Sequence, residues 1–193
     1  MDDLAVFIIL YLFILIQRLT ELGIAKKNEQ WMKGKGAIEF GTKHYQVIVF
    51  MHVLFLVSFL AEKITLNRSL SGLWLALIIV FVGTQFLRIW AISSLGKFWN
   101  TKIIVLPNAD VIRTGPYRFI KHPNYLVVTI EMLIIPLLFN AYITACIFSL
   151  FNAMMLAVRI RAEEQALRAF TEYDGTFQRS NRFLPKLLNK YDN

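Results

Sequence analysis

Four long apolar runs constrain the fold of this chain more than any other feature of its sequence. They cover residues 4–25, 46–61, 72–92 and 124–158. A bilayer core takes about 20 mainly apolar residues per helix, so each of the first three runs suits one crossing. The last run is close to twice that length, and Pro136 and Asn140 near its middle predict a hairpin of two crossings. We therefore expect an all-α integral membrane protein with five transmembrane helices, the last two forming the hairpin.

Composition agrees with a membrane protein of one domain. The chain of 193 residues is 56% hydrophobic, which is above the usual share for soluble domains. The single Cys146 lies inside an apolar run, which excludes a disulfide framework and a cysteine metal cluster. Asp2 and Asp3 precede the first run, where a signal peptide would carry basic residues. We therefore expect the first run to be retained as a span.

The distribution of basic residues predicts the orientation. Seventeen Lys and Arg residues fall in three segments, 25–45, 93–122 and the tail from Arg159 onward, whereas the opposite side has only Lys63 and Arg68. Cytoplasmic loops carry an excess of Lys and Arg, so we place the N-terminus outside and the C-terminus in the cytoplasm. The tail 159–177 has helical periodicity and predicts a cytoplasmic helix, either a continuation of the fifth span or an amphipathic helix against it.

The first candidate site lies where the basic segment enters the fourth span. Pro123 is placed to begin a helix, with His122 at its mouth and Asn124 and Tyr125 in its first turn. Free backbone N–H groups at such an N-terminus favour an anion such as a carboxylate. The alternative is a belt of Tyr, Lys and Arg that only anchors the helix at the headgroups.

Two further groups of charged residues are candidates for chemistry. Glu131 lies inside the fourth span, where an ionisable residue is costly, so it is either functional or paired with Arg88 or Arg18. On the tail helix, Arg159 and Glu163 are four residues apart, a spacing that is also typical of a solvated helix. The three histidines lack metal-ligand spacing, and we expect no metal site and no nucleic-acid partner.

Two motifs give the chain a resemblance to a known family. "GPYRFIKHPNYL" and, about 35 residues later, "RIRAEEQALRAFTEYDGTF" resemble the isoprenylcysteine carboxyl methyltransferase family over roughly residues 94–178. The positions that fall on the family pattern are Gly115, Pro116, Tyr117, His122, Pro123, Tyr125, Arg159, Glu163, Glu164 and Leu167. Lys121 stands where the family usually has Arg, and Val127 where many members have Gly.

This resemblance implies an S-adenosylmethionine-dependent methyltransferase. It implies one domain, residues 1–193, in which 1–92 form the first three spans and 93–193 the cofactor-binding and catalytic core. The implied cofactor-binding residues are Tyr117, Lys121, His122, Pro123, Asn124, Tyr125, Glu163 and Glu164. Arg159 is the candidate for orienting the acceptor oxygen, and Glu131 or Glu163 is the candidate base.

The segments "LGKFWNTKIIVLP" and "EMLIIPL" narrow the resemblance to a bacterial subgroup linked to type III polyketide synthases. That subgroup O-methylates alkylpyrones and alkylresorcinols, so the predicted acceptor is a lipophilic small molecule in the bilayer of a bacterial cell membrane. The alternatives are methylation of an isoprenylcysteine carboxylate, N-methylation of a phospholipid, and a non-catalytic membrane protein that binds lipid.

Overall fold

The computed structural model describes residues 3–177 and 181–183 and confirms an all-helical architecture. The long helices are α1 (Asp3–Gly34), α2 (Thr42–Thr65), α3 (Trp74–Leu95), α4 (Pro123–Leu137) and α5 (Tyr142–Phe170). The shorter elements are α6 (Tyr173–Phe177), the 3-10 helices η1 (Gly96–Phe98) and η2 (Gly115–Arg118), and the strands β1 (Ile38–Phe40) and β2 (Ile103–Val105). The tail cations Arg179, Lys186 and Lys190 lie outside the described residues.

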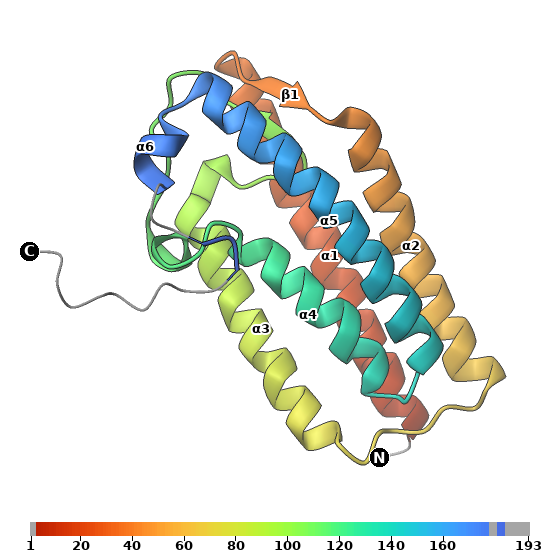
Figure 1. The fold of residues 1–193 in the computed structure, drawn as a ribbon. Helices are drawn as coiled ribbons and strands as arrows, with labels where there is room; N and C mark the ends of the chain where they lie inside the picture. The colour runs from red at the N-terminus through yellow and green to blue at the C-terminus, as the bar shows by residue number, and fades with distance from the viewer. Residues whose placement is uncertain (1–2, 178–180, 184–193) are drawn as a thin grey trace, which may run out of the picture.

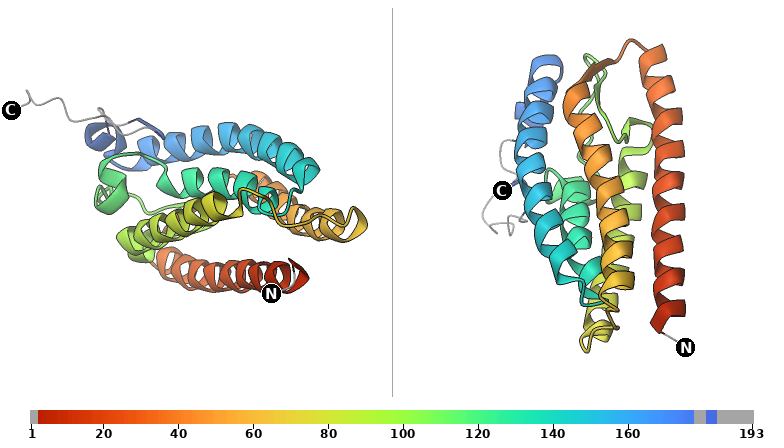
Figure 2. Two further views of the ribbon diagram at one scale, coloured as in Figure 1. Left: turned by 90° about the horizontal axis from the view of Figure 1, so that it is seen from below. Right: turned by 90° about the vertical axis from the view of Figure 1, so that its right-hand side faces the viewer.

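The long helices run side by side as a bundle (Figure 1), with α1 on one side, α5 on the other and α2, α3 and α4 between them (Figure 2). Within the described residues, four helices are long and apolar enough to cross a membrane: α1, α2, α3 and α5. The 15 residues of α4 reach only about 22 Å at 1.5 Å per residue, which is less than the roughly 30 Å hydrocarbon core. The five-span count is therefore not confirmed, because its fourth member is a short helix.

Helix α1 is longer than its apolar run and ends at a glycine. It continues nine residues beyond the predicted end at residue 25, so part of the predicted loop 25–45 is helix. The N–H of Ala37 donates to the carbonyl of Met32, and that of Gly36 donates to Lys33. This six-residue closure needs a left-handed residue, and Gly36 supplies it with a φ of 88°. The sequence "GKG" at residues 34–36 therefore ends α1.

The predicted hairpin between α4 and α5 is present, and two side chains shape it. Asn140 takes a left-handed φ of 52°, which allows the chain to turn after α4. Glu62 of α2 then caps α5, accepting the backbone N–H groups of Ile143 and Thr144 at 3.3 and 2.8 Å. The break thus lies at Asn140, as the sequence indicates, and a carboxylate from another helix fixes it.

A two-stranded antiparallel sheet joins segments that the sequence analysis treated as loops. β1 pairs with β2, with Glu39 opposite Ile104. Strand β2 is buried, and Ile103 and Val105 pack against Ala166 of α5. The sheet therefore places the segment 99–105 beside the last turns of α5.

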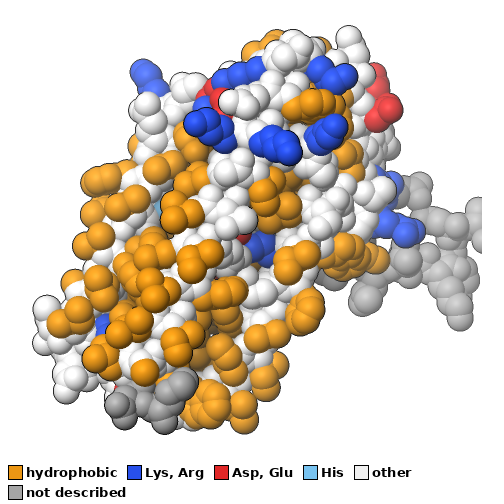
Figure 3. Space-filling model, turned by 180° about the vertical axis from the view of Figure 1, so that it is seen from behind, with side chains coloured by type: hydrophobic (Ala, Val, Ile, Leu, Met, Phe, Trp, Pro, Cys, Tyr) orange, Lys and Arg blue, Asp and Glu red, His pale blue; other side chains and the backbone are white. Residues whose placement is uncertain are grey.

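The surface separates into a charged end and an apolar body. Seen from behind, Lys and Arg side chains gather at the end where β1 lies, and most of the remaining face is hydrophobic (Figure 3). Exposed large apolar side chains continue along the helices, as with Leu12 of α1, Val57 of α2 and Phe86 of α3. This distribution suits an integral membrane protein. The side of the membrane that each end faces stays a prediction.

Candidate functional site

The Gly-Pro-Tyr turn is fixed by close contact with the end of α3. Gly115 has a φ of 56°, and a Cβ built there would lie 2.0 Å from Oγ of Ser94 and 2.9 Å from Nε1 of Trp90. A side chain here would displace Ser94 and Trp90, and the left-handed φ also favours glycine. The turn then continues as η2 and directs Tyr117, which is 7% exposed, into the interior. Gly115 is therefore needed to place Tyr117.

His122 caps α4 and contacts an acid of α5. Its carbonyl accepts the N–H of Leu126, and Pro123 occupies the first position of the helix. Its Nε2 lies 3.1 Å from Oε1 of Glu164. Arg182 donates to both oxygens of the same carboxylate, at 2.9 Å from Nε and 2.7 Å from Nη2. His122 and Glu164 are 5% and 3% exposed, so this contact is buried.

A second set of contacts joins Tyr125 of α4 to two residues of α5. The Tyr125 hydroxyl donates to Oε2 of Glu163 and accepts from Nε of Arg159 at 2.8 Å. The Arg159 guanidinium also lies over the Tyr125 ring and donates through Nη2 to the carbonyl of Thr101. The Tyr125 ring also stacks on His122, with centroids 5.3 Å apart. The two motifs of the sequence therefore meet in one network.

The segment that carries Thr101 is held against α1 by two asparagines. Asn28 donates to the carbonyls of Gly96 and Trp99, at 3.1 and 2.7 Å. Asn100 donates in return to the carbonyl of Ala25 at 3.0 Å. These bonds satisfy a buried loop that would otherwise leave backbone carbonyls unpaired. They also explain how a loop supplies a fixed partner for Arg159.

A cavity of about 160 Å³ lies beside this network, between α5, α6, β2 and the segment before α4. Of the predicted cofactor residues, Tyr117, Lys121, His122 and Glu163 line it. Much of the remaining wall is apolar and includes Met32, Leu95, Phe98, Ile103, Val105, Val111, Leu167 and Phe177. The cavity thus combines an apolar wall with a small group of charged and hydroxyl-bearing side chains.

Two tyrosines in the wall present neutral hydroxyls. Burial raises the pKa of Tyr117, and the nearby Glu163 carboxylate raises it further. Burial also raises the pKa of Tyr173, with Glu164 as the next cause. The hydroxyl of Tyr173 is buried and has no hydrogen-bond partner in the described part of the chain. An unpaired buried hydroxyl in a cavity wall is a group that a polar ligand would satisfy.

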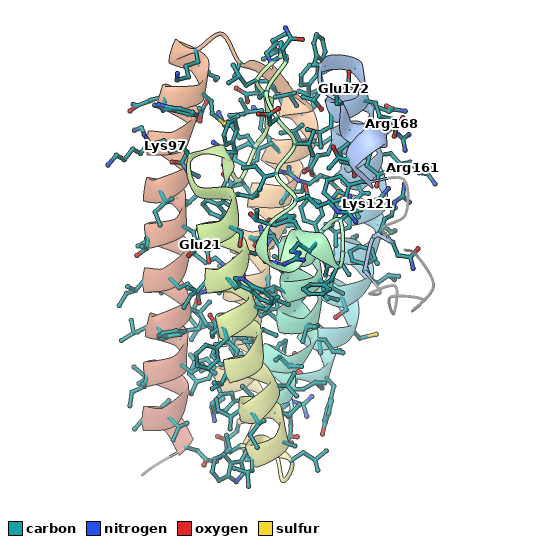
Figure 4. All side chains as sticks on the ribbon, turned by 90° about the vertical axis from the view of Figure 1, so that its left-hand side faces the viewer. Glu21, Lys97, Lys121, Arg161, Arg168 and Glu172 are labelled. Carbon is teal, nitrogen blue, oxygen red and sulfur yellow. The ribbon has the colours of Figure 1, made fainter. Side chains whose placement is uncertain are left out.

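The other predicted cofactor residues lie around the cavity without lining it. Glu164 is turned toward His122 and Arg182, and its two oxygens are taken. Pro123 is buried in the start of α4, and Asn124 has a buried Oδ1 that no described residue contacts. Lys121, which does line the cavity, lies beside Tyr173, with its Nζ 5.5 Å from the ring centroid. Arg161 and Arg168 of α5 point away from the bundle (Figure 4).

Glu131 belongs to a different cluster, deeper along the bundle. Both arginines that the sequence offered as partners contact it: Arg88 bonds both of its oxygens and Arg18 donates at 3.0 Å. Glu21 of α1 points toward α3 and accepts from Arg88 at 2.6 Å (Figure 4). Gln85 donates to the remaining face of Glu131 at 2.8 Å. The structure does not bring Glu131 together with Arg159 or Glu163.

Several residues of the site had no signal in the sequence analysis. Thr101 contributes only a carbonyl, which any residue carries. Tyr173 lies in the tail that the sequence analysis read only as helical, yet this residue lines the cavity. Arg182 lies 18 residues beyond its partner Glu164, so no helical spacing connects them. Within the described residues, no three His, Cys, Asp or Glu side chains gather as metal ligands would.

Comparison with known proteins matches the region that holds the site. A family model described as "Isoprenylcysteine carboxyl methyltransferase (ICMT) family" matches residues 76–169. The match runs from α3 through α4 to the last turn of α5. It therefore includes Gly115, His122, Tyr125, Arg159 and Glu163, and it ends before Tyr173 and Arg182.

Three relatives extend the comparison beyond this region. The uncharacterized protein YpbQ of Bacillus subtilis (strain 168) is 48% identical over 165 residues, which cover 86% of this chain and 98% of YpbQ. An uncharacterized protein of Haemophilus influenzae is 31% identical over 158 residues, covering 80% of this chain and 90% of that protein. The nickel-cobalt-cadmium resistance protein NccN of Alcaligenes xylosoxydans xylosoxydans is 25% identical over 130 residues, covering 66% of this chain and 60% of NccN.

Proposed function

Because the chain belongs to the isoprenylcysteine carboxyl methyltransferase family, a family of membrane methyltransferases, we propose that it O-methylates a lipophilic acceptor with S-adenosylmethionine as donor. The observation that carries the proposal is the meeting of the two motifs: Tyr125 bonds both Arg159 and Glu163, and Glu163 also lines the cavity. A cation, an acid and a phenol thus lie side by side next to a binding cavity.

The residues of the cavity fit the cofactor. Its apolar wall suits the adenosine, and the unpaired hydroxyl of Tyr173 offers a hydrogen bond to a polar group. Lys121 suits the carboxylate of the methionine part and Glu163 suits its ammonium, whereas His122 suits a hydroxyl or amino group that donates a hydrogen bond. Glu163 has one oxygen, Oε1, that receives no hydrogen bond from the described residues. Both oxygens of Glu164 are already bonded, so Glu164 supports the site by holding His122 and not by contacting the cofactor.

The protein contributes mainly by holding the reactants. When bound, S-adenosylmethionine supplies a methyl group that its sulfonium has already activated. Arg159 uses Nε and Nη2 for protein contacts, which leaves Nη1 to orient an acceptor oxygen. Because Oε1 of Glu163 is assigned to the ammonium and Oε2 accepts from Tyr125, we assign no base and expect an acceptor that is already ionised. For an acceptor that is already ionised, positioning can account for roughly 7–11 kcal/mol of the barrier in favourable cases.

For the acceptor, we favour the acidic hydroxyl of an alkylpyrone or alkylresorcinol. Support comes from "LGKFWNTKIIVLP" and "EMLIIPL", which resemble the subgroup linked to type III polyketide synthases. The Arg159 guanidinium favours an anionic oxygen over the amine of a phospholipid headgroup. The carboxylate of an isoprenylcysteine is the second candidate, since it presents the same charge.

The proposed orientation puts the cavity on the cytoplasmic side of a bacterial cell membrane, with the N-terminus outside. The cavity lies toward the end of the bundle where Lys and Arg side chains gather. Positive residues favour the cytoplasmic side, where S-adenosylmethionine is made. The hydrocarbon tail of the acceptor would then remain between the spans while its head reaches Arg159.

Purified protein incubated with methyl-labelled S-adenosylmethionine tests the proposal. The acceptors to compare are a long-chain alkylpyrone, a farnesylated cysteine analogue and phosphatidylethanolamine. We expect label in the alkylpyrone and its loss with Arg159→Ala, whereas Arg168→Ala, on the same helix but 48% exposed, keeps activity. Absence of label in every acceptor, together with no binding of the cofactor, would refute the methyltransferase assignment.

A further inference from the structure

Arg182 is linked to His122 in two ways, directly through its backbone carbonyl and indirectly through Glu164. The N–H groups of Lys121 and His122 donate to the carbonyls of Asn181 and Arg182, at 3.0 and 3.2 Å. The Arg182 side chain reaches Glu164, whose Oε1 lies 3.1 Å from Nε2 of His122. The segment 181–183 is therefore joined to the mouth of α4 by its backbone and to α5 by its arginine.

Glu164 depends on this arginine for its charge balance. The carboxylate is 3% exposed and lies next to a second acid, Glu163, on α5. A buried carboxylate without a cation is strongly disfavoured. Arg182 meets both oxygens through Nε and Nη2, which is the two-point geometry that only a guanidinium provides.

The paired Glu164 in turn selects one arrangement of the His122 ring. A carboxylate bonded twice by a guanidinium acts only as an acceptor, so Nε2 of His122 carries the proton in this contact. Stacking on Tyr125, at an interplanar angle of 21°, holds the plane of the ring. Nδ1 is then the nitrogen that has no hydrogen bond within the described residues, and His122 lines the cavity.

We propose that Arg182 is a positioning residue of the cofactor site: through Glu164 and its own carbonyl, it holds His122 with Nδ1 free for a ligand. The inference rests on the proposed function, since the ligand is the cofactor. It assigns a role to a residue outside the matched motifs, and it makes Glu164 a support of His122 and leaves contact with the ammonium to Glu163.

Binding of S-adenosylhomocysteine, measured by calorimetry on the full chain in detergent, tests the proposal. Loss of one hydrogen bond to the cofactor typically weakens binding roughly two- to tenfold, and we expect this for Arg182→Gln. Arg182→Lys should recover part of the affinity, because it restores charge without the two-point geometry. Arg168→Gln is the matched control, since Arg168 pairs with Asp174 at the surface and should bind like the wild type.

Nitrogen NMR of ¹⁵N-histidine-labelled protein gives a readout that a general loss of stability would not mimic. The chain has three histidines, and His122→Asn identifies the signal of residue 122. In the wild type we expect the Nε2–H tautomer, and in Arg182→Gln a mixture of tautomers at His122 alone. If Arg182→Gln does not fold, Arg182→Lys carries the same comparison in a milder form.

The outcomes separate this inference from the proposed function. If the wild type does not bind S-adenosylhomocysteine, the cofactor assignment fails. If the wild type binds and His122→Ala binds weakly, but both Arg182 variants match the wild type in affinity and tautomer, only the role of Arg182 is wrong.

Discussion

Two clusters of buried charges differ in how fully they are paired, one in the middle of the bundle and one beside the cavity. In the middle cluster, Glu21 and Glu131 face Arg18 and Arg88, and every carboxylate oxygen accepts at least one hydrogen bond. In the cavity cluster, among the described residues, Glu163 bonds Tyr125 through one oxygen only and the hydroxyl of Tyr173 has no partner.

This difference separates a structural cluster from a binding site. In the middle cluster, two acids and two arginines bond one another, so no carboxylate oxygen is left for a ligand. These bonds instead hold α1, α3 and α4 together. Groups that face a cavity with hydrogen-bonding capacity to spare can be satisfied by a ligand instead. Acids and arginines at similar burial therefore serve either structure or binding, depending on whether their hydrogen-bonding groups are already paired.

The largest effect is expected from Arg88→Ala, which would break the middle cluster. Arg88 is 2% exposed and contacts both acids, so its loss leaves two buried carboxylates with only Arg18. Removing one partner of a buried ion pair typically costs roughly 3–5 kcal/mol. Thermal unfolding in detergent measures the loss, with Lys97→Ala as an exposed control. Unchanged stability would show that the cluster does not hold the helices together.

Next in size is Arg159→Ala, which tests the cavity cluster. Arg159 orients the acceptor oxygen, and a misplaced reactant typically lowers the rate by roughly 10²-fold, so we expect kcat to fall far more than cofactor affinity. Steady-state methylation and calorimetry on the same preparation separate the two quantities. A loss confined to cofactor affinity would move Arg159 from the acceptor to the cofactor.

A smaller effect is expected from His122→Ala. The imidazole lines the cavity and is held by Glu164, so its removal takes away a contact to the cofactor but leaves Arg159 in place. A hydrogen bond of this kind contributes roughly 0.5–1.5 kcal/mol. Calorimetry with S-adenosylhomocysteine is the measurement. If affinity stays at the wild-type value, His122 serves only to cap α4.

The smallest effect on turnover should come from Glu131→Gln. The amide keeps the shape but removes the charge that Arg18 and Arg88 face, so stability should fall by roughly 3–5 kcal/mol, as for other broken buried pairs, while turnover per folded molecule stays within about twofold of the wild type. The test is kcat normalised to the monodisperse fraction. A turnover loss of a hundredfold in stable protein would return Glu131 to the list of catalytic bases and erase the distinction between the clusters.

The helical fold and the centre of the site could be predicted from the sequence, for physical reasons. Apolar runs report helices because burial in lipid requires them, and Pro136 with Asn140 located the hairpin. The basic helix mouth and the Arg-Glu-Glu helix were found because each is local. Their meeting through Tyr125 follows from the hairpin, which returns the chain to the same end.

What the sequence could not supply was contact between distant segments. The pairing of β1 with β2 depends on three residues in each strand, too few to give a pattern. Glu131 stayed ambiguous because a sequence lists possible partners but does not choose among Arg18, Arg88 and a ligand. Arg182 could not be predicted, because it reaches Glu164 only when the segment 181–183 pairs with the residues before α4.

The shortness of α4 has a consequence for the choice of acceptor. If the hairpin turn lies at the outer edge of the hydrocarbon, a helix of about 22 Å ends roughly 8 Å below the inner edge. The chemistry would then occur beneath the headgroups, at a depth that an amphiphile reaches by partitioning. The concentration that matters is the one dissolved in the bilayer, so each added methylene should raise apparent affinity even where the protein makes no new contact.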